Sequence, residues 1–108
     1  MKDIVDVLQD ARCTGKHVYI CGNGGSAGTA SHTAADLFKI AELRALSLDG
    51  NPSLSTAIIN DRGWEYLYTD QLERLYHPGD ILITYSVHGG SGSDEAGEWS
   101  QNLTRAID

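Results

Sequence analysis

Three short apolar runs divide the chain, and segments in which apolar residues recur at helical spacing lie between them. The runs cover 17–21, 43–48 and 80–85, which is the usual length of β-strands. Helical spacing marks 3–12, a helix that starts near Ser26 and runs to 38, a short helix over 53–59 with Ser53 as its N-cap, and a longer helix over 64–75. A final helix is predicted from the apolar positions Ala96, Trp99, Leu103, Ala106 and Ile107.

Strands that alternate with helices predict right-handed βαβ units and a parallel sheet. The run over 80–85 is almost continuously apolar, as expected for a strand buried on both faces. With the first strand in the centre, the order is 2-1-3, the start of a flavodoxin-like, doubly wound, three-layer α/β sheet that is incomplete with three strands. The expected organisation is a single partial domain over 1–108, in which a leading helix over 1–15 precedes a βαβαβα core over 16–108.

Composition narrows the class of protein. At 41% hydrophobic residues the chain is globular, and it has neither an apolar run of about 20 residues nor a secretion signal, so a cytoplasmic, non-membrane protein is expected. The net charge of −7 argues against direct binding of nucleic acid. Cys13 and Cys21 lack the spacing of a metal or disulfide site, and Cys21 is expected to be a small apolar residue of a buried strand.

The candidate chemistry begins in the turn Gly22-Asn23-Gly24-Gly25-Ser26 between the first strand and its helix. Glycines let backbone N–H groups approach a ligand, and the helix N-terminus carries partial positive charge, so the turn predicts an anion site. Glycines that only close a tight turn are the alternative. A second loop rich in serine and glycine, 86–93, follows the third strand at the neighbouring position of the sheet, and this favours the anion site.

His32 and Asp36 are four residues apart on the predicted second helix, and therefore on one face. Together they can share a metal ion or a proton. Migration of a carbonyl group along a sugar needs a base at one carbon and an acid at the next, a task that suits a carboxylate beside an imidazole. A surface ion pair without function is the alternative.

Four segments in this order resemble the sugar isomerase (SIS) domain, and within it the phosphoheptose isomerase group: CGNGGSA (21–27), HTAADL (32–37), LSLDGNPSLSTAIINDRG (46–63) and PGDILITYSVHGGSG (78–92). That group interconverts sedoheptulose 7-phosphate and a heptose 7-phosphate, an aldose–ketose isomerisation through an enediol. The resemblance implies that His32 and Asp36 bind zinc and form the catalytic pair. It implies a substrate site made of Asn23, Gly24, Gly25, Ser26, Asn60, Asp61, Ser86, Val87, His88 and Ser91.

The chain also departs from the group's pattern. Asp36 is one methylene shorter than the group's glutamate, His88 stands in a loop that has lost two hydroxyl positions, and Asp94 and Glu95 place negative charge near the expected phosphate. Members of the group continue with two more strands and a C-terminal helix whose Gln and His complete the site.

The resemblance implies a phosphosugar isomerase of carbohydrate metabolism that works as a homo-oligomer or with a complementing chain, and we expect little activity from the 108 residues alone. A sugar-phosphate-binding regulatory module, or a protein that associates with a replication initiator, is the alternative. An inactive structural fragment is the third hypothesis.

Overall fold

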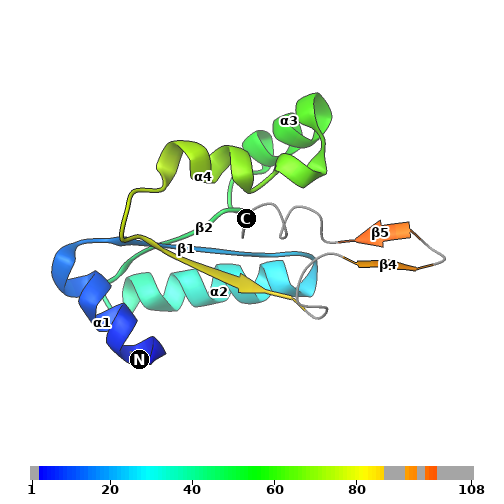
Figure 1. Ribbon diagram of the computed structural model, residues 1–108. Helices are drawn as coiled ribbons and strands as arrows, with labels where there is room; N and C mark the ends of the chain where they lie inside the picture. The colour runs from blue at the N-terminus through cyan, green and yellow to red at the C-terminus, as the bar shows by residue number, and fades with distance from the viewer. Residues whose placement is uncertain (1–2, 87–91, 95–96, 100–108) are drawn as a thin grey trace.

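The computed structural model describes residues 3–86, 92–94 and 97–99. Its main sheet has three parallel strands in the order β2-β1-β3: β1 (His17–Gly22), β2 (Arg44–Ser47) and β3 (Ile81–Tyr85). Helices α1 (Ile4–Thr14) and α2 (Gly25–Lys39) lie on one face of the sheet, and α3 (Pro52–Arg62) and α4 (Thr69–Leu75) lie on the other (Figure 1). The predicted α/β class and strand order are confirmed.

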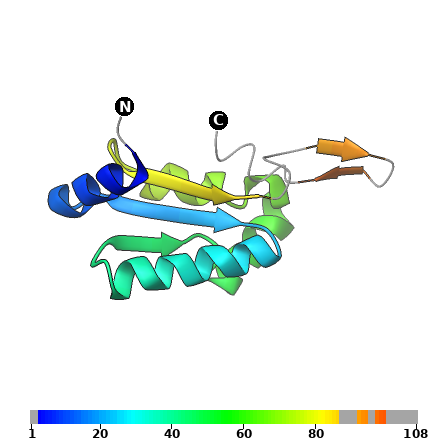
Figure 2. The same cartoon turned by 90° about the horizontal axis from the view of Figure 1, so that it is seen from below.

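The central strand β1 carries the core on both of its faces, because successive side chains of a strand point to opposite sides. Val18 and Ile20 pack with Ala30 and Ala34 of α2, and all four are buried. Figure 2 shows α2 running along β1 and β2. Tyr19 and Cys21 join a second cluster on the α3/α4 face, which includes Leu48, Leu67 and Tyr68.

Cys21 is fully buried in this second cluster. Burial, and to a lesser degree the charge of Asp49, raises the pKa of the Cys21 thiol to about 12, so the sulfur stays protonated at neutral pH. Its predicted role as an apolar core residue agrees with this environment.

Local signals define both ends of α1. The Asp3 side chain caps the helix by accepting a hydrogen bond from the Asp6 N–H at 2.8 Å. Gly15 ends it in the left-handed conformation, with φ of 71°, where a side chain would be strained. Within the described residues, no helix combines the length and the apolar character needed to cross a bilayer.

Helix α3 differs from the prediction at both ends. Its N-cap is Asn51, whose side chain accepts from the Leu54 N–H at 3.1 Å, and Ser53 lies inside the helix. Pro52 fixes this start, because proline is tolerated in the first turn of a helix, where its missing N–H costs nothing. The helix then continues past Ile59 to Arg62, and Gly63 ends it with φ of 105°.

The predicted helix over 64–75 is interrupted. A 3₁₀ turn, η1 (Trp64–Tyr66), comes first, and α4 begins at Thr69 after the turn at Leu67 and Tyr68. These two side chains are 8% and 1% exposed because the turn directs them into the cluster on β1. Burial of two large side chains outweighs the weak preference for a continuous helix.

The last predicted helix is wrong where the chain is described. Strands β4 (Gly92–Asp94) and β5 (Gly97–Trp99) pair there antiparallel. Glycine is the weakest helix former after proline, so Gly92 and Gly97 work against the helix that the apolar spacing indicated. The positions Ala96, Leu103, Ala106 and Ile107 lie outside the described residues.

Asp80 joins the starts of β1 and β3. Its buried carboxylate accepts hydrogen bonds from the backbone N–H groups of His17 at 2.9 Å and His77 at 2.8 Å. Burial acts to raise the pKa of Asp80, but these two hydrogen bonds and the nearby imidazoles outweigh it, and the pKa is lowered.

We expect Asp80→Asn to lower the free energy of unfolding at pH 7 by about 2 kcal/mol, because a charged acceptor of two hydrogen bonds is lost. A lowered pKa in the folded state stabilises the fold well above the ordinary value of 3.8 and loses that effect as pH falls below it. The difference between wild type and variant in urea unfolding should therefore shrink between pH 7 and pH 3. Asp6→Asn, at an exposed position, should stay within about 0.5 kcal/mol at both pH values. A constant gap for Asp80→Asn would contradict the charged-acceptor role.

Candidate functional site

The loop from Gly22 to Ser26 is built around a close backbone approach. A Cβ on Gly22 would lie 2.6 Å from the Ser26 carbonyl oxygen, so only glycine fits there. Gly24 has φ of 56°, and the Ser26 N–H bonds the Asn23 carbonyl at 2.9 Å. Helix α2 begins at Gly25 rather than Ser26.

The start of α2 suits an anion. Its N-cap Gly24 provides no side-chain hydrogen bond, and the first turn of α2 contains no acidic residue. The Ser26, Ala27 and Gly28 N–H groups already bond backbone carbonyls of the loop, so what the start of α2 offers a negatively charged group is the positive end of the helix dipole.

The second predicted loop begins at the same edge of the sheet. Gly22 and Tyr85 are register partners in β1 and β3, so Ser86 follows directly beside the start of the glycine loop. The structure thus brings Ser86 to the same end of the sheet as Asn23, as predicted. Val87, His88 and Ser91 lie outside the described residues, and their predicted roles stay predictions.

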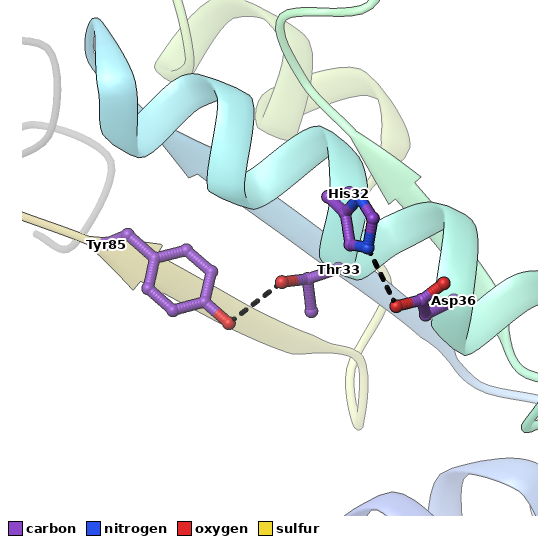
Figure 3. Close-up of polar contacts among 4 residues, drawn as sticks. All are labelled: His32, Thr33, Asp36 and Tyr85. Atoms are coloured by element: carbon purple, nitrogen blue, oxygen red, sulfur yellow. Dashed lines mark hydrogen bonds and ion pairs between the residues drawn. The ribbon is translucent and has the colours of Figure 1, made fainter.

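His32 and Asp36 form the predicted pair on α2. His32 Nε2 lies 3.2 Å from Asp36 Oδ2, and the side chains are 81% and 54% exposed. Figure 3 shows the pair on α2 with Thr33 turned toward β3 instead. The pair is therefore open to a ligand from the solvent side of α2.

Two hydrogen bonds that the sequence patterns did not predict tie α2 to the edge strand β3 and to the turn that follows the other edge strand, β2. The Thr33 and Tyr85 hydroxyls lie 3.1 Å apart, and the Ser31 hydroxyl donates to Asp49 Oδ1 at 3.2 Å (the first is drawn in Figure 3). Ser31 and Thr33 directly flank His32 in the sequence. The one sequence signal for this contact was the position of Tyr85 directly before the serine loop, which could have marked it as a residue near the site.

Asn60 and Asp61 lie in the last turn of α3. The Asn60 side-chain amide donates to Asp61 Oδ1 at 3.0 Å, and both residues are exposed. The structure therefore brings these two together, and their reach toward sugar hydroxyls stays a prediction.

A zinc ion usually needs four protein or water ligands. His32 and Asp36 offer one nitrogen and one oxygen donor, and no group of three or more His, Cys, Asp or Glu side chains able to hold a metal forms within residues 3–86 and the described strands beyond them. The described donor set alone does not fit zinc.

The fold and the site define a class of protein: a parallel α/β domain with a glycine-rich loop after β1 and with Ser86 directly after the adjacent strand β3, at the edge where open α/β sheets bind ligands. The family comparison is consistent with this class. The SIS domain model matches residues 1–94, and the chain belongs to the SIS domain family.

The most informative relatives are phosphoheptose isomerases and a biosynthetic protein. The chain is 41% identical over 93 residues to phosphoheptose isomerase of Geotalea daltonii, covering 82% of this chain and 48% of that protein. It is 43% identical over 103 residues to the lincomycin biosynthesis protein LmbN of Streptomyces lincolnensis, covering 90% of this chain and 36% of LmbN.

Solved structures agree. Phosphoheptose isomerase GmhA from Neisseria gonorrhoeae matches 94% of this chain with a TM-score of 0.77 and 31% identity, and the match covers 50% of that chain. The chain therefore spans about half the length, or less, of the relatives it matches.

Proposed function

We propose that this chain is the phosphosugar-binding part of a phosphoheptose isomerase-like SIS protein, with sedoheptulose 7-phosphate as its ligand. The observation that carries the proposal is the register of β1 and β3, which sets the glycine loop and Ser86 side by side. The similarity to phosphoheptose isomerases supports the choice of ligand.

The loops would bind the phosphate. The positive end of the α2 dipole, with no acidic residue in its first turn, matches the charge of the phosphate, and the Ser86 hydroxyl adds a side-chain hydrogen bond. Asn60 and Asp61 offer an amide and a carboxylate for the sugar hydroxyls.

The isomerisation step would use Asp36 and His32. Asp36 takes a proton from the hydroxyl-bearing carbon next to the ketone, and the electrons of that C–H bond form the enediolate. The proton of that carbon's hydroxyl passes to the former carbonyl oxygen, and the proton on Asp36 then returns to the former carbonyl carbon to give the aldose. His32, 3.2 Å from the carboxylate, orients it. We assign zinc no step, since its remaining ligands would have to come from outside the described residues.

Assembly with further chains is part of the proposal. Ile4 and Val5 of α1 are 76% and 60% exposed, and Phe38 and Ile40 at the end of α2 are 65% and 75% exposed. Large apolar side chains exposed on two helices support contact with another polypeptide, such as a second copy in a cytoplasmic homo-oligomer.

Sedoheptulose 7-phosphate should raise the Tm of the chain in a concentration-dependent way, because a ligand that binds only the folded state stabilises it. The measurement is thermal unfolding at increasing ligand, with NMR of the sugar in the same samples to detect any aldose. We expect binding and little or no turnover. Ser86→Ala should need about tenfold more ligand than the wild type for the same rise in Tm, which corresponds to a loss of about 1.4 kcal/mol in binding free energy.

Ser53→Ala is the matched control, since Ser53 is an exposed serine of α3. It should show the same ligand response as wild type. No rise in Tm with the sugar phosphate, or an equal rise in Ser86→Ala, would contradict the proposed site.

A further inference from the structure

A tyrosine distant in sequence contacts the start of the glycine loop. Tyr68 lies in the turn between η1 and α4, and its side chain is 1% exposed. Its hydroxyl donates to the Gly22 carbonyl at 2.5 Å and lies 3.4 Å from Asn23 Oδ1. Tyr68 thus connects the glycine loop to η1 and α4, which pack on the face of the sheet opposite α2 (Figure 1).

The hydroxyl has one proton, and the distances assign it to the Gly22 carbonyl. Burial raises the pKa of Tyr68 above its ordinary value, with smaller contributions from Cys21 and Asp49, so the hydroxyl keeps this proton at neutral pH. The hydroxyl can therefore donate to the Gly22 carbonyl at neutral pH.

Gly22 has two restraining contacts. A Cβ on it would clash with the Ser26 backbone, and its carbonyl accepts the hydrogen bond of Tyr68. Both contacts act on the residue from which Asn23 and Gly24 leave the strand.

We propose that Tyr68 is a positioning residue: its hydroxyl holds the Gly22–Ser26 loop in the shape that binds the sugar phosphate. This inference rests on the proposed function of the loop. A preformed loop binds more tightly because less ordering remains to be done when the ligand arrives.

The chain offers a closely matched control. Tyr19 is also buried, at 2% exposed, and its hydroxyl also donates to a backbone carbonyl, that of Leu75 at 2.9 Å. Leu75 ends α4 near the start of β3, at the opposite end of the sheet from the glycine loop (Figure 1). Tyr68→Phe and Tyr19→Phe each remove one buried hydrogen bond and keep the ring.

The first measurement is amide hydrogen exchange of the whole chain without ligand. Tyr68→Phe should speed exchange at 23–26 about five- to tenfold, the factor that corresponds to one hydrogen bond. Tyr19→Phe should leave these amides unchanged, although both variants lower the Tm by about 5 °C. Equal exchange at 23–26 in Tyr68→Phe and wild type overturns the inference.

The second measurement is the affinity for sedoheptulose 7-phosphate by calorimetry. Tyr68→Phe should bind about five- to tenfold more weakly, and Tyr19→Phe should bind as wild type does. Equal affinity of the two variants overturns the inference while the proposed function stands. Failure of the wild-type chain to bind contradicts the proposed function itself, and the inference falls with it.

Discussion

Replacing Gly22 with alanine is expected to abolish tight binding of the sugar phosphate and to destabilise the fold. The new Cβ would lie 2.6 Å from the Ser26 carbonyl oxygen and 2.7 Å from its carbon, and neither atom belongs to a flexible side chain. The loop must open to accommodate it, at a cost of about 3 kcal/mol. We expect affinity for sedoheptulose 7-phosphate to fall by at least about tenfold, because the loop and the positive end of α2 move away from the ligand.

Gly28→Ala is the control for this variant. Gly28 lies on α2, and a Cβ there meets no atom within 4 Å. Alanine should stabilise the helix by up to about 1 kcal/mol and leave affinity unchanged. Urea unfolding and calorimetry measure both effects, and a Gly22→Ala chain with wild-type stability and affinity would show that the close approach is not required.

Arg62→Met should produce the second large effect, on stability. Arg62 Nη1 lies 3.1 Å from Asp70 Oδ1, and the Asp70 side chain is only 8% exposed. That oxygen has no aligned hydrogen bond, so the ion pair is its compensation for burial. Loss of the guanidinium leaves a buried, unpaired carboxylate, and we expect a cost of about 2 kcal/mol, moderated because Arg62 is 55% exposed.

A double-mutant cycle separates this charge effect from lost packing, since the guanidinium also stacks 4.5 Å from the centre of the Tyr66 ring. Adding Asp70→Asn to Arg62→Met should recover about half of the lost stability in urea unfolding at pH 7. Arg74→Met, at an exposed position of α4, should change stability by less than about 0.5 kcal/mol. Strictly additive effects of the two substitutions would contradict the ion-pair explanation.

The parts of the fold that sequence patterns predicted are those that depend on neighbouring residues. The apolar run before Gly22, the glycine loop and the helix after it are all encoded within one short segment, and the structure confirms β1 and α2. The interruption after Tyr66 was missed because its cause is not local. Tyr68 turns inward to reach Gly22, 46 residues away in sequence, and helical spacing carries no sign of that contact.

The candidate site divides in the same way. The i,i+4 spacing of His32 and Asp36 predicted their contact, and helix geometry alone ensures it. The predicted helix over 64–75 gave Tyr68 no part in the site, because only the three-dimensional position of its buried hydroxyl reveals the link to the loop. The hydrogen bonds of α2 to Asp49 and Tyr85 depend on the strand order, which places β2 and β3 on either side of β1 beneath this helix.

Successive residues of a helix point about 100° apart, so the side chains at 31 and 33 diverge to either flank of α2 when Ala30 and Ala34 face the sheet. Each flank is anchored, Ser31 to Asp49 beyond β2 and Thr33 to Tyr85 of β3. Rotation of α2 about its axis in either direction would break one of these two hydrogen bonds. His32 lies between these two anchored residues and therefore projects from the solvent face of α2 before any ligand binds.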